Sequence, residues 1–131
     1  MLRPAPCETE LGLTITVEVA SDIVAVPGLK ATVNVQDGQA LFVTTHGAAF
    51  SEPGYGDSVV LVAVDGASTQ DYPRQRIVTN TTVENWSVSG ALFLPAGSHV
   101  IEVYVARMAG TATFGGYGPA FGELTLLTLS Q

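Results

Sequence analysis

Apolar and polar residues alternate with a period of two along most of the chain. In "LGLTITVEV", from Leu11 to Val19, every second residue is apolar, and glycine, threonine or glutamate stands between them. A strand with one face in a core and the other in water has this pattern. The same alternation in "ATVNV", "ALFVTTH" and "HVIEVYVAR" predicts strands at 31–35, 40–46 and 99–107.

One further segment predicts a strand that is apolar on both faces. The segment "SVVLVAV" at 58–64 is apolar at every position after its serine. A strand inside a sheet that is covered on both faces has this composition. In "HVIEVYVAR", Ile101, Val103 and Val105 share one face, opposite Glu102 and Tyr104. The remaining predicted strands lie at 76–80, 86–94, 110–114 and 123–129.

Glycine, proline and aspartate mark the turns between these segments. The turn signals are "VPGLK" at 26–30, "QDGQ" at 36–39, "DG" at 65–66 and "PAGS" at 95–98. Such residues preset turn conformations and interrupt regular pairing. No window of a dozen residues carries the 3.6-residue period of an amphipathic helix. The pattern therefore predicts an all-β chain of eight to ten short strands.

The length of 131 residues corresponds to one domain. We expect a single antiparallel β-sandwich with jelly-roll topology over 11–131, preceded by an extended N-terminal arm over 1–10. The arm, "MLRPAPCETE", has two prolines and few apolar groups, so it would be disordered or lie along a partner. An immunoglobulin order is disfavoured because Cys7 is the only cysteine, and the Cys…Trp…Cys spacing is missing.

Composition limits the classes of partner. The chain is 47% hydrophobic and only 13% charged, so many apolar residues must face one another or other copies of the chain. Twelve acidic residues against five basic ones give a net charge of −7. Such a surface repels nucleic acid and anionic membranes, so we expect neither as a partner. The first residues lack the apolar core of a signal peptide, which indicates synthesis in a cytoplasm.

No motif in the sequence indicates a particular chemical activity. The two histidines, His46 and His99, lie on separate predicted strands, and no G-x-S-x-G nucleophile motif is present. Asp57, Asp65 and Asp71 surround one strand and carry the oxygen ligands that calcium takes, although aspartates in loops are commonly solvated turn residues. We therefore expect no catalytic residue, no metal and no cofactor, and a protein that is not an enzyme.

The last predicted strand, "ELTLLTL", is apolar on both faces, which makes its leucines a candidate subunit interface. Leu124 and Leu126 point one way, and Leu127 and Leu129 the other. A strand with two apolar faces must be covered twice. The second cover is either a neighbouring copy or the remainder of the same sandwich.

Two loops carry candidate ligand or partner residues. The segment "FGGYGPAFG" at 114–122 is either a turn whose Phe114, Tyr117 and Phe121 cap the sandwich, or an aromatic ligand platform. Tyr72, Arg74 and Arg76 lie in a second loop and include the only basic cluster of the chain. These arginines are candidates for contact with a partner, and the alternative is solvated loop arginines.

From about Val35 onward the chain resembles a known superfamily. The residues that carry the resemblance are "VVLVAVDG", "SVSGALFLPAGSHVIEVYVAR" and "FGELTLLTL", separated by turns and a glycine-rich gap. This order resembles the jelly-roll of the tumour necrosis factor and complement globular-head superfamily. It is closest in style to phage or bacterial virion decoration and fibre-head domains. The resemblance implies a homotrimer with the last strand near the threefold axis.

The expected function follows from the resemblance together with the residue patterns. We expect a non-enzymatic structural protein on a virion surface: a phage capsid decoration (cement) protein or the head of a fibre. Its partners would be other copies of itself and a major capsid or fibre protein. The alternative is a carbohydrate- or receptor-binding module that uses the loops at 66–76 and 110–122.

Overall fold

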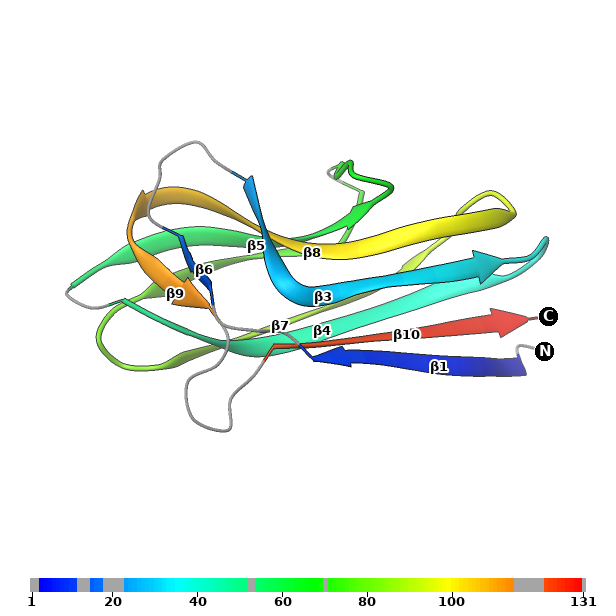
Figure 1. Cartoon of the computed structure of the whole chain (residues 1–131), viewed down its shortest axis with the longest axis horizontal. Helices are drawn as coiled ribbons and strands as arrows, with labels where there is room; N and C mark the ends of the chain where they lie inside the picture. Colours follow the sequence, from blue (N-terminus) through cyan, green and yellow to red (C-terminus); the bar gives the residue numbers. More distant parts are fainter. Residues whose placement is uncertain are drawn as a thin grey trace.

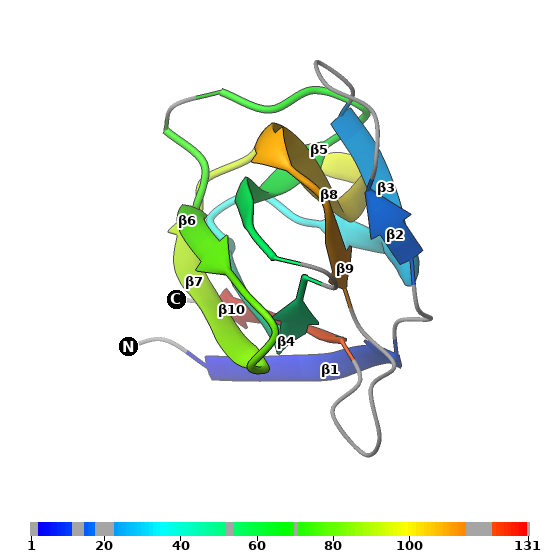
Figure 2. The same cartoon turned by 90° about the vertical axis from the view of Figure 1, so that its left-hand side faces the viewer.

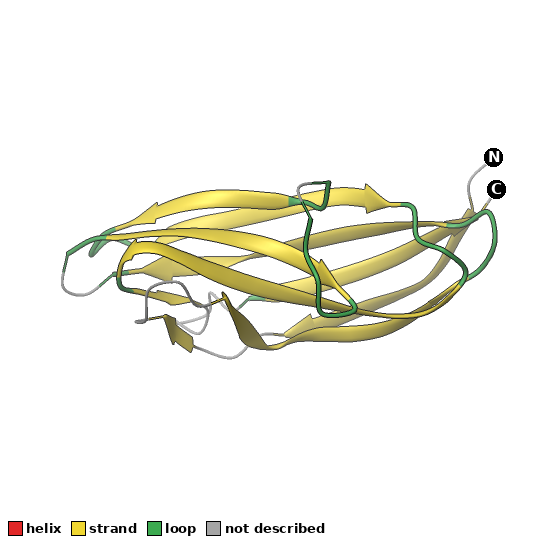
Figure 3. Cartoon of the chain, turned by 90° about the horizontal axis from the view of Figure 1, so that it is seen from above, coloured by secondary structure: helices red, strands yellow, loops and turns green. Residues whose placement is uncertain are grey.

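The computed structural model describes residues 3–11, 15–17, 23–51, 54–69, 71–114 and 122–130, and the regular structure in them is entirely β-strand (Figure 3). The strands are β1 (Arg3–Leu11), β2 (Ile15–Val17), β3 (Ile23–Val35), β4 (Ala40–Phe50), β5 (Gly56–Val64), β6 (Arg74–Thr79), β7 (Glu84–Leu92), β8 (Gly97–Gly110), β9 (Ala112–Phe114) and β10 (Glu123–Ser130). The described residues include no helix long and apolar enough to cross a membrane.

The strands form two antiparallel sheets that face each other (Figures 1 and 2). In the first sheet β7 pairs with one edge of β4, while β10 and then β9 pair with its other edge. Strand β1 pairs with β10, and β2 pairs with β9. The second sheet has the order β3-β8-β5-β6. The predicted all-β antiparallel sandwich is therefore confirmed.

The core between the two sheets consists of apolar residues that alternate with polar residues along the strands. Ile101, Val103 and Val105 of β8 are each 0% exposed, which confirms the predicted inward face of this strand. Strand β5 lies between β8 and β6, and all of its residues except Val59 are buried, as its two-sided apolar pattern predicts. Burial of these side chains provides the main favourable free energy of folding.

The largest buried side chains meet at one end of the core. The rings of Trp86 in β7 and Phe114 in β9 lie 5.7 Å apart between centroids, at an interplanar angle of 53°. Gly47 of β4 lies directly against the Trp86 ring, where a Cβ would collide with three ring atoms. A glycine is required here because the indole occupies the space of any side chain.

Strand β3 differs from its prediction. The Pro-Gly pair at 27–28 was expected to end a strand, but β3 continues through it from Ile23 to Val35. The register with β8 shifts between Ala25 and Lys30, and Gly28 has a φ of 86°. The Pro-Gly pair thus forms a β-bulge. Strand β3 is an edge strand and accommodates it, because the N–H that proline lacks is not needed for pairing with a further strand.

The amino-terminal segment is extended and paired within the chain. Strand β1 covers Arg3–Leu11 and runs antiparallel to β10, with Arg3 opposite Ser130 and a register shift between Pro4 and Cys7. Residues 3–10 of the segment expected as an arm over 1–10 therefore lie along the last strand of their own subunit. Of the strand expected over 11–19, Leu11 is the last residue of β1 and Ile15–Val17 form β2.

Candidate functional site

The four leucines of β10 divide between the inside and the outside of the sandwich. Leu124 and Leu126 are 0% and 1% exposed and belong to the core cluster. Leu127 and Leu129 alternate with them and are only partly buried. The first pair is therefore covered within the subunit, which narrows the candidate interface on this strand to the second pair.

Leu127 and Leu129 belong to a larger apolar surface on the outer face of the first sheet. Leu127 stands opposite Phe42 of β4, and Leu129 stands opposite Ala40. Phe42 is 38% exposed, an unusual state for a phenylalanine on a sheet face. We call Ala40, Phe42, Leu127 and Leu129 the apolar patch. No charged residue is among its members.

The same face becomes polar farther along the strands. Thr125 of β10 stands opposite Thr44 of β4, and Glu123 stands opposite His46. His46 Nε2 lies 3.5 Å from Glu123 Oε1, and both side chains are well exposed. His46 thus makes a surface contact with a carboxylate, and the apolar patch occupies one end of the face only.

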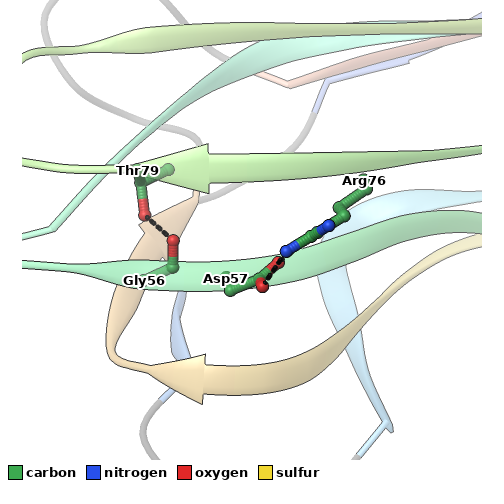
Figure 4. Close-up of polar contacts among 4 residues, drawn as sticks. All are labelled: Gly56, Asp57, Arg76 and Thr79. Carbon is green, nitrogen blue, oxygen red and sulfur yellow. Dashed lines mark hydrogen bonds and ion pairs between the residues drawn. The ribbon is translucent and has the colours of Figure 1, made fainter.

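Arg76 is engaged within the chain (Figure 4). Its Nε and Nη2 donate to the two carboxylate oxygens of Asp57 on the neighbouring strand, at 2.9 and 2.5 Å. The Asp57 side chain is 10% exposed, against 67% for Arg76. The hydrogen bonds from Arg76 lower the pKa of Asp57, and the same contact raises the pKa of Arg76.

A small polar cluster accompanies this pair at the same end of β5. The hydroxyls of Thr79 and Ser51 lie 2.6 Å apart and are both buried, and Thr79 Oγ1 donates to the Gly56 carbonyl at 3.4 Å (Figure 4). A Cβ on Gly56 would lie 2.6 Å from Thr79 Oγ1. The cluster ties the ends of β4, β5 and β6 together, which is a structural role.

Arg74, the other candidate for partner contact, is also held by its own subunit. Its Nη2 donates to the Thr69 carbonyl and lies 3.4 Å from Ser68 Oγ. The Ser68 hydroxyl in turn donates to the Val62 carbonyl at 2.9 Å. A partner that used Arg74 or Arg76 would therefore compete with contacts already made within the chain.

The aromatic segment at 114–122 is anchored in the core at its beginning. Phe114 is 0% exposed and packs on Trp86, so it is unavailable as part of a ligand platform. Tyr117 and Phe121 lie outside the described residues. Gly122 is buried, and a Cβ there would come within 3.0 Å of Leu29 and 3.4 Å of the Trp86 ring.

His99 makes a polar contact that no motif in the sequence predicts. Its Nδ1 lies 2.7 Å from Asp65 Oδ2, and its Nε2 lies 2.7 Å from the Pro95 carbonyl oxygen. The backbone N–H of Val100 donates to the other Asp65 oxygen at 2.8 Å. A carboxylate and a carbonyl only accept hydrogen bonds, so the imidazole makes both contacts as donor when it is doubly protonated.

The pKa values follow from this geometry. The hydrogen bond to Asp65, followed by that to Pro95, raises the pKa of His99 above its ordinary value. The hydrogen bond from Val100, followed by that from His99, lowers the pKa of Asp65. The contact connects the turn after β5 to the turn before β8. The "DG" and "PAGS" segments of the sequence predict the two turns, but they do not predict that the turns lie close together.

Tyr72, the remaining candidate of the second loop, lines an open groove. The groove has a volume of about 340 Å³ and lies between Asp71 with Tyr72 on one side and residues 91–95 on the other. Tyr72 and Leu94 pack against the core. Phe93 is 81% exposed. The sequence pointed to Tyr72, but no local signal connected it with 91–95.

The three aspartates considered as calcium ligands lie in separate surroundings. Asp57 binds Arg76, Asp65 binds His99, and Asp71 borders the groove. In the described part of the chain, no three His, Cys, Asp or Glu side chains gather in a way that could hold a metal ion.

Comparison with known proteins identifies no relative by sequence. Neither a protein-family model nor a curated protein matches the chain.

Proposed function

We propose that the chain is a non-enzymatic structural protein that acts as a homotrimer on the surface of a larger assembly, with the apolar patch as the contact between copies. The observation that carries the proposal is the uncharged outer face formed by Phe42, Leu127 and their neighbours Ala40 and Leu129. Apolar surface removed from water contributes roughly 25 cal/mol per Å² to association.

The distribution of charge favours contact at this face. The chain carries a net charge of −7, so two copies repel each other wherever acidic surfaces meet. None of the four members of the apolar patch is charged, and the ion pair of the same sheet face, His46 with Glu123, lies at the other end of that face. Copies that meet through the patch keep their acidic groups apart.

The pairing of the strands supports a jelly-roll as the fold of this unit. We group β1 with β2, and β9 with β10, because β1 pairs with β10 and β2 pairs with β9. The first strand then pairs with the last, β3 with β8, β4 with β7 and β5 with β6. A double-stranded ribbon rolled into two sheets gives this nested order, which is the architecture of a jelly-roll.

The jelly-roll order makes a trimer the preferred assembly. It strengthens the resemblance to the tumour necrosis factor and complement globular-head superfamily, in which the last strand lies near a threefold axis. Leu127 and Leu129 come from this last strand. A ring of three copies closes on itself, so each patch is covered and no open filament results.

A phage virion is the setting that we propose, with the chain as a capsid decoration protein or a fibre head. The two ends of the described chain meet at one end of the sandwich, where Arg3 stands opposite Ser130 (Figure 1). Attachment to a capsid or fibre protein near this end would leave the opposite loops facing outward. The resemblance is the source of the virion assignment, and mixing the purified protein with the particle tests it.

Sedimentation equilibrium tests the trimer directly. The unmodified protein should sediment with three times the mass of the chain across a hundredfold concentration range, and Phe42→Glu should sediment as a folded monomer. Val78→Glu is a matched control, because Val78 is 50% exposed and belongs to β6 in the other sheet. A stable monomer for the unmodified protein would contradict the proposal.

A further inference from the structure

The groove beside Tyr72 has fixed walls and an unusual exposed ring. Tyr72 packs against the core from one side of the groove. On the other side, the Pro95 carbonyl is bound by His99, which holds the turn that follows β7. Phe93 lies on this second side and is 81% exposed, the highest value among the exposed large hydrophobic side chains of the described chain. Tyr72 and the backbone at Pro95 are already held in place, so they lose little conformational entropy when a ligand binds.

Asp71 adds one polar group to these aromatic walls. Its backbone N–H bonds to Thr69 Oγ1 at 3.2 Å, which fixes the main chain at this point. Its carboxylate oxygens make no hydrogen bond or ion pair with the described residues, and the residue is exposed. The groove thus presents two aromatic rings and a hydrogen-bond acceptor within about 340 Å³, near the lower end of the usual size for ligand sites.

We propose that this groove is a saccharide-binding site that takes a ring of a neutral sugar. The C–H face of the ring packs on Phe93 and Tyr72, and a hydroxyl donates a hydrogen bond to the Asp71 carboxylate. Its lining shares no residue with the apolar patch. It lies between 71–72 and the end of β7, and Ala91 of its lining stands opposite Phe42, so the groove and the patch adjoin.

The chemistry of the groove favours a sugar over other ligands. A wholly apolar ligand would take the Asp71 carboxylate out of water without giving it a hydrogen bond, which is costly. The groove is also open to solvent, so part of any ligand stays in water. A sugar ring carries an apolar face for the aromatic walls and hydroxyls for both Asp71 and water, so each part of it meets a suitable environment.

Binding is best measured by ligand-observed NMR, with titration calorimetry for any sugar that gives a signal. The probes are glucose, galactose, mannose, N-acetylglucosamine and their common disaccharides, at millimolar concentrations. We expect at least one to bind, and Phe93→Ala and Asp71→Asn each to weaken that binding by about tenfold, the equivalent of 1.4 kcal/mol. Tyr55→Ala is the matched control, because Tyr55 is an aromatic residue that is 52% exposed and outside the groove.

Three other outcomes would overturn the assignment of the groove as a saccharide-binding site. No binding by any probe would do so, and so would binding that both groove variants leave unchanged. A third outcome is that arginine amide binds, loses its affinity in Asp71→Asn, and no sugar binds. The groove would then be a site for a cation over aromatic rings. Sedimentation of Phe93→Ala, expected to remain trimeric, separates failure of this site from failure of the proposed assembly.

Discussion

His99 lies 2.7 Å from Asp65 at one end of the sandwich, although 34 positions separate the two residues in the chain. The pair joins the turn after β5 to the beginning of β8. Through Pro95, the same imidazole also holds the segment that carries Phe93. A single ionisable side chain therefore contacts both segments at this end of the molecule.

Stability should fall as the pH rises through the pKa of His99. Folding raises this pKa above its ordinary value of 6.5, so the protonated pair stabilises the fold fully below about pH 6.5. This contribution is lost as the pH rises through the folded-state pKa. Denaturant unfolding at about pH 6 and about pH 8.5 measures the difference, with His99→Gln for comparison. A pH dependence that is the same in both proteins would contradict the prediction.

The pair should also weaken in acid, for a separate reason. The pKa of Asp65 is lowered below its ordinary value of 3.8, so its contribution is present above that value. It disappears as the pH falls through the folded-state pKa of the carboxyl. Asp65→Asn should therefore unfold more easily than the unmodified protein at about pH 5, and the difference should shrink toward about pH 2. Denaturation midpoints at the two pH values provide the measurement.

Removing Arg76 should destabilise the protein more than removing its partner Asp57. Arg76→Ala leaves a carboxylate that is only 10% exposed without its main hydrogen-bond donor, and an unpaired buried charge is costly. Asp57→Ala leaves a guanidinium that is 67% exposed and remains solvated. The two thermal midpoints should differ in this order. Equal midpoints would indicate that the Asp57 carboxylate finds water or another donor.

Gly47→Ala should be strongly destabilising, because the new methyl group would overlap the buried Trp86 ring. Overpacking of a core typically costs about 1–3 kcal/mol. Ser89→Ala, an exposed substitution on the neighbouring strand β7, should change the free energy of unfolding by less than about 0.5 kcal/mol. Urea denaturation of the three proteins compares them, and a Gly47→Ala protein of unchanged stability would show that the indole can move.

Local patterns predicted the strands well, because alternation reports which face of a strand is buried. They gave the inward face of β8 at Ile101, Val103 and Val105, and the interior position of β5. The same reasoning did not predict the pairing of the segment at 3–11. Its prolines suggest an unpaired arm, whereas its pairing with β10 depends on a partner more than a hundred positions away.

The candidate sites depend on contacts between distant segments, and sequence reasoning reached them only in part. It named Tyr72 and the four leucines of β10, and it could not tell which leucines face the core. It did not connect His99 with Asp65, whose proximity follows from the pairing of β5 with β8, or Tyr72 with Phe93, whose proximity follows from the packing of the two sheets. Turn signals locate a turn in the sequence but say nothing of which other turn lies beside it.

Two adjacent leucines of β10 provide the sharpest test of which face meets a neighbour. Leu126 is 1% exposed in the core, whereas Leu127 lies on the outer face opposite Phe42. Fully burying a leucine is worth roughly 1.5–3 kcal/mol, and a buried unpaired charge costs more than that contact alone. Leu126→Glu should therefore give unfolded or insoluble protein, because the charge would enter the core of every subunit.

Leu127→Glu should fold, because its charge remains in water in the single subunit, but it should sediment as a monomer. Circular dichroism checks that the β-structure is retained, and sedimentation gives the mass. Thr125→Glu is the control on the same face, outside the apolar patch and next to Glu123. We expect it to fold as well, so it separates the effect of an added charge from the loss of the leucine. A Leu127→Glu protein that remains trimeric would move the contact between copies away from this face of β10.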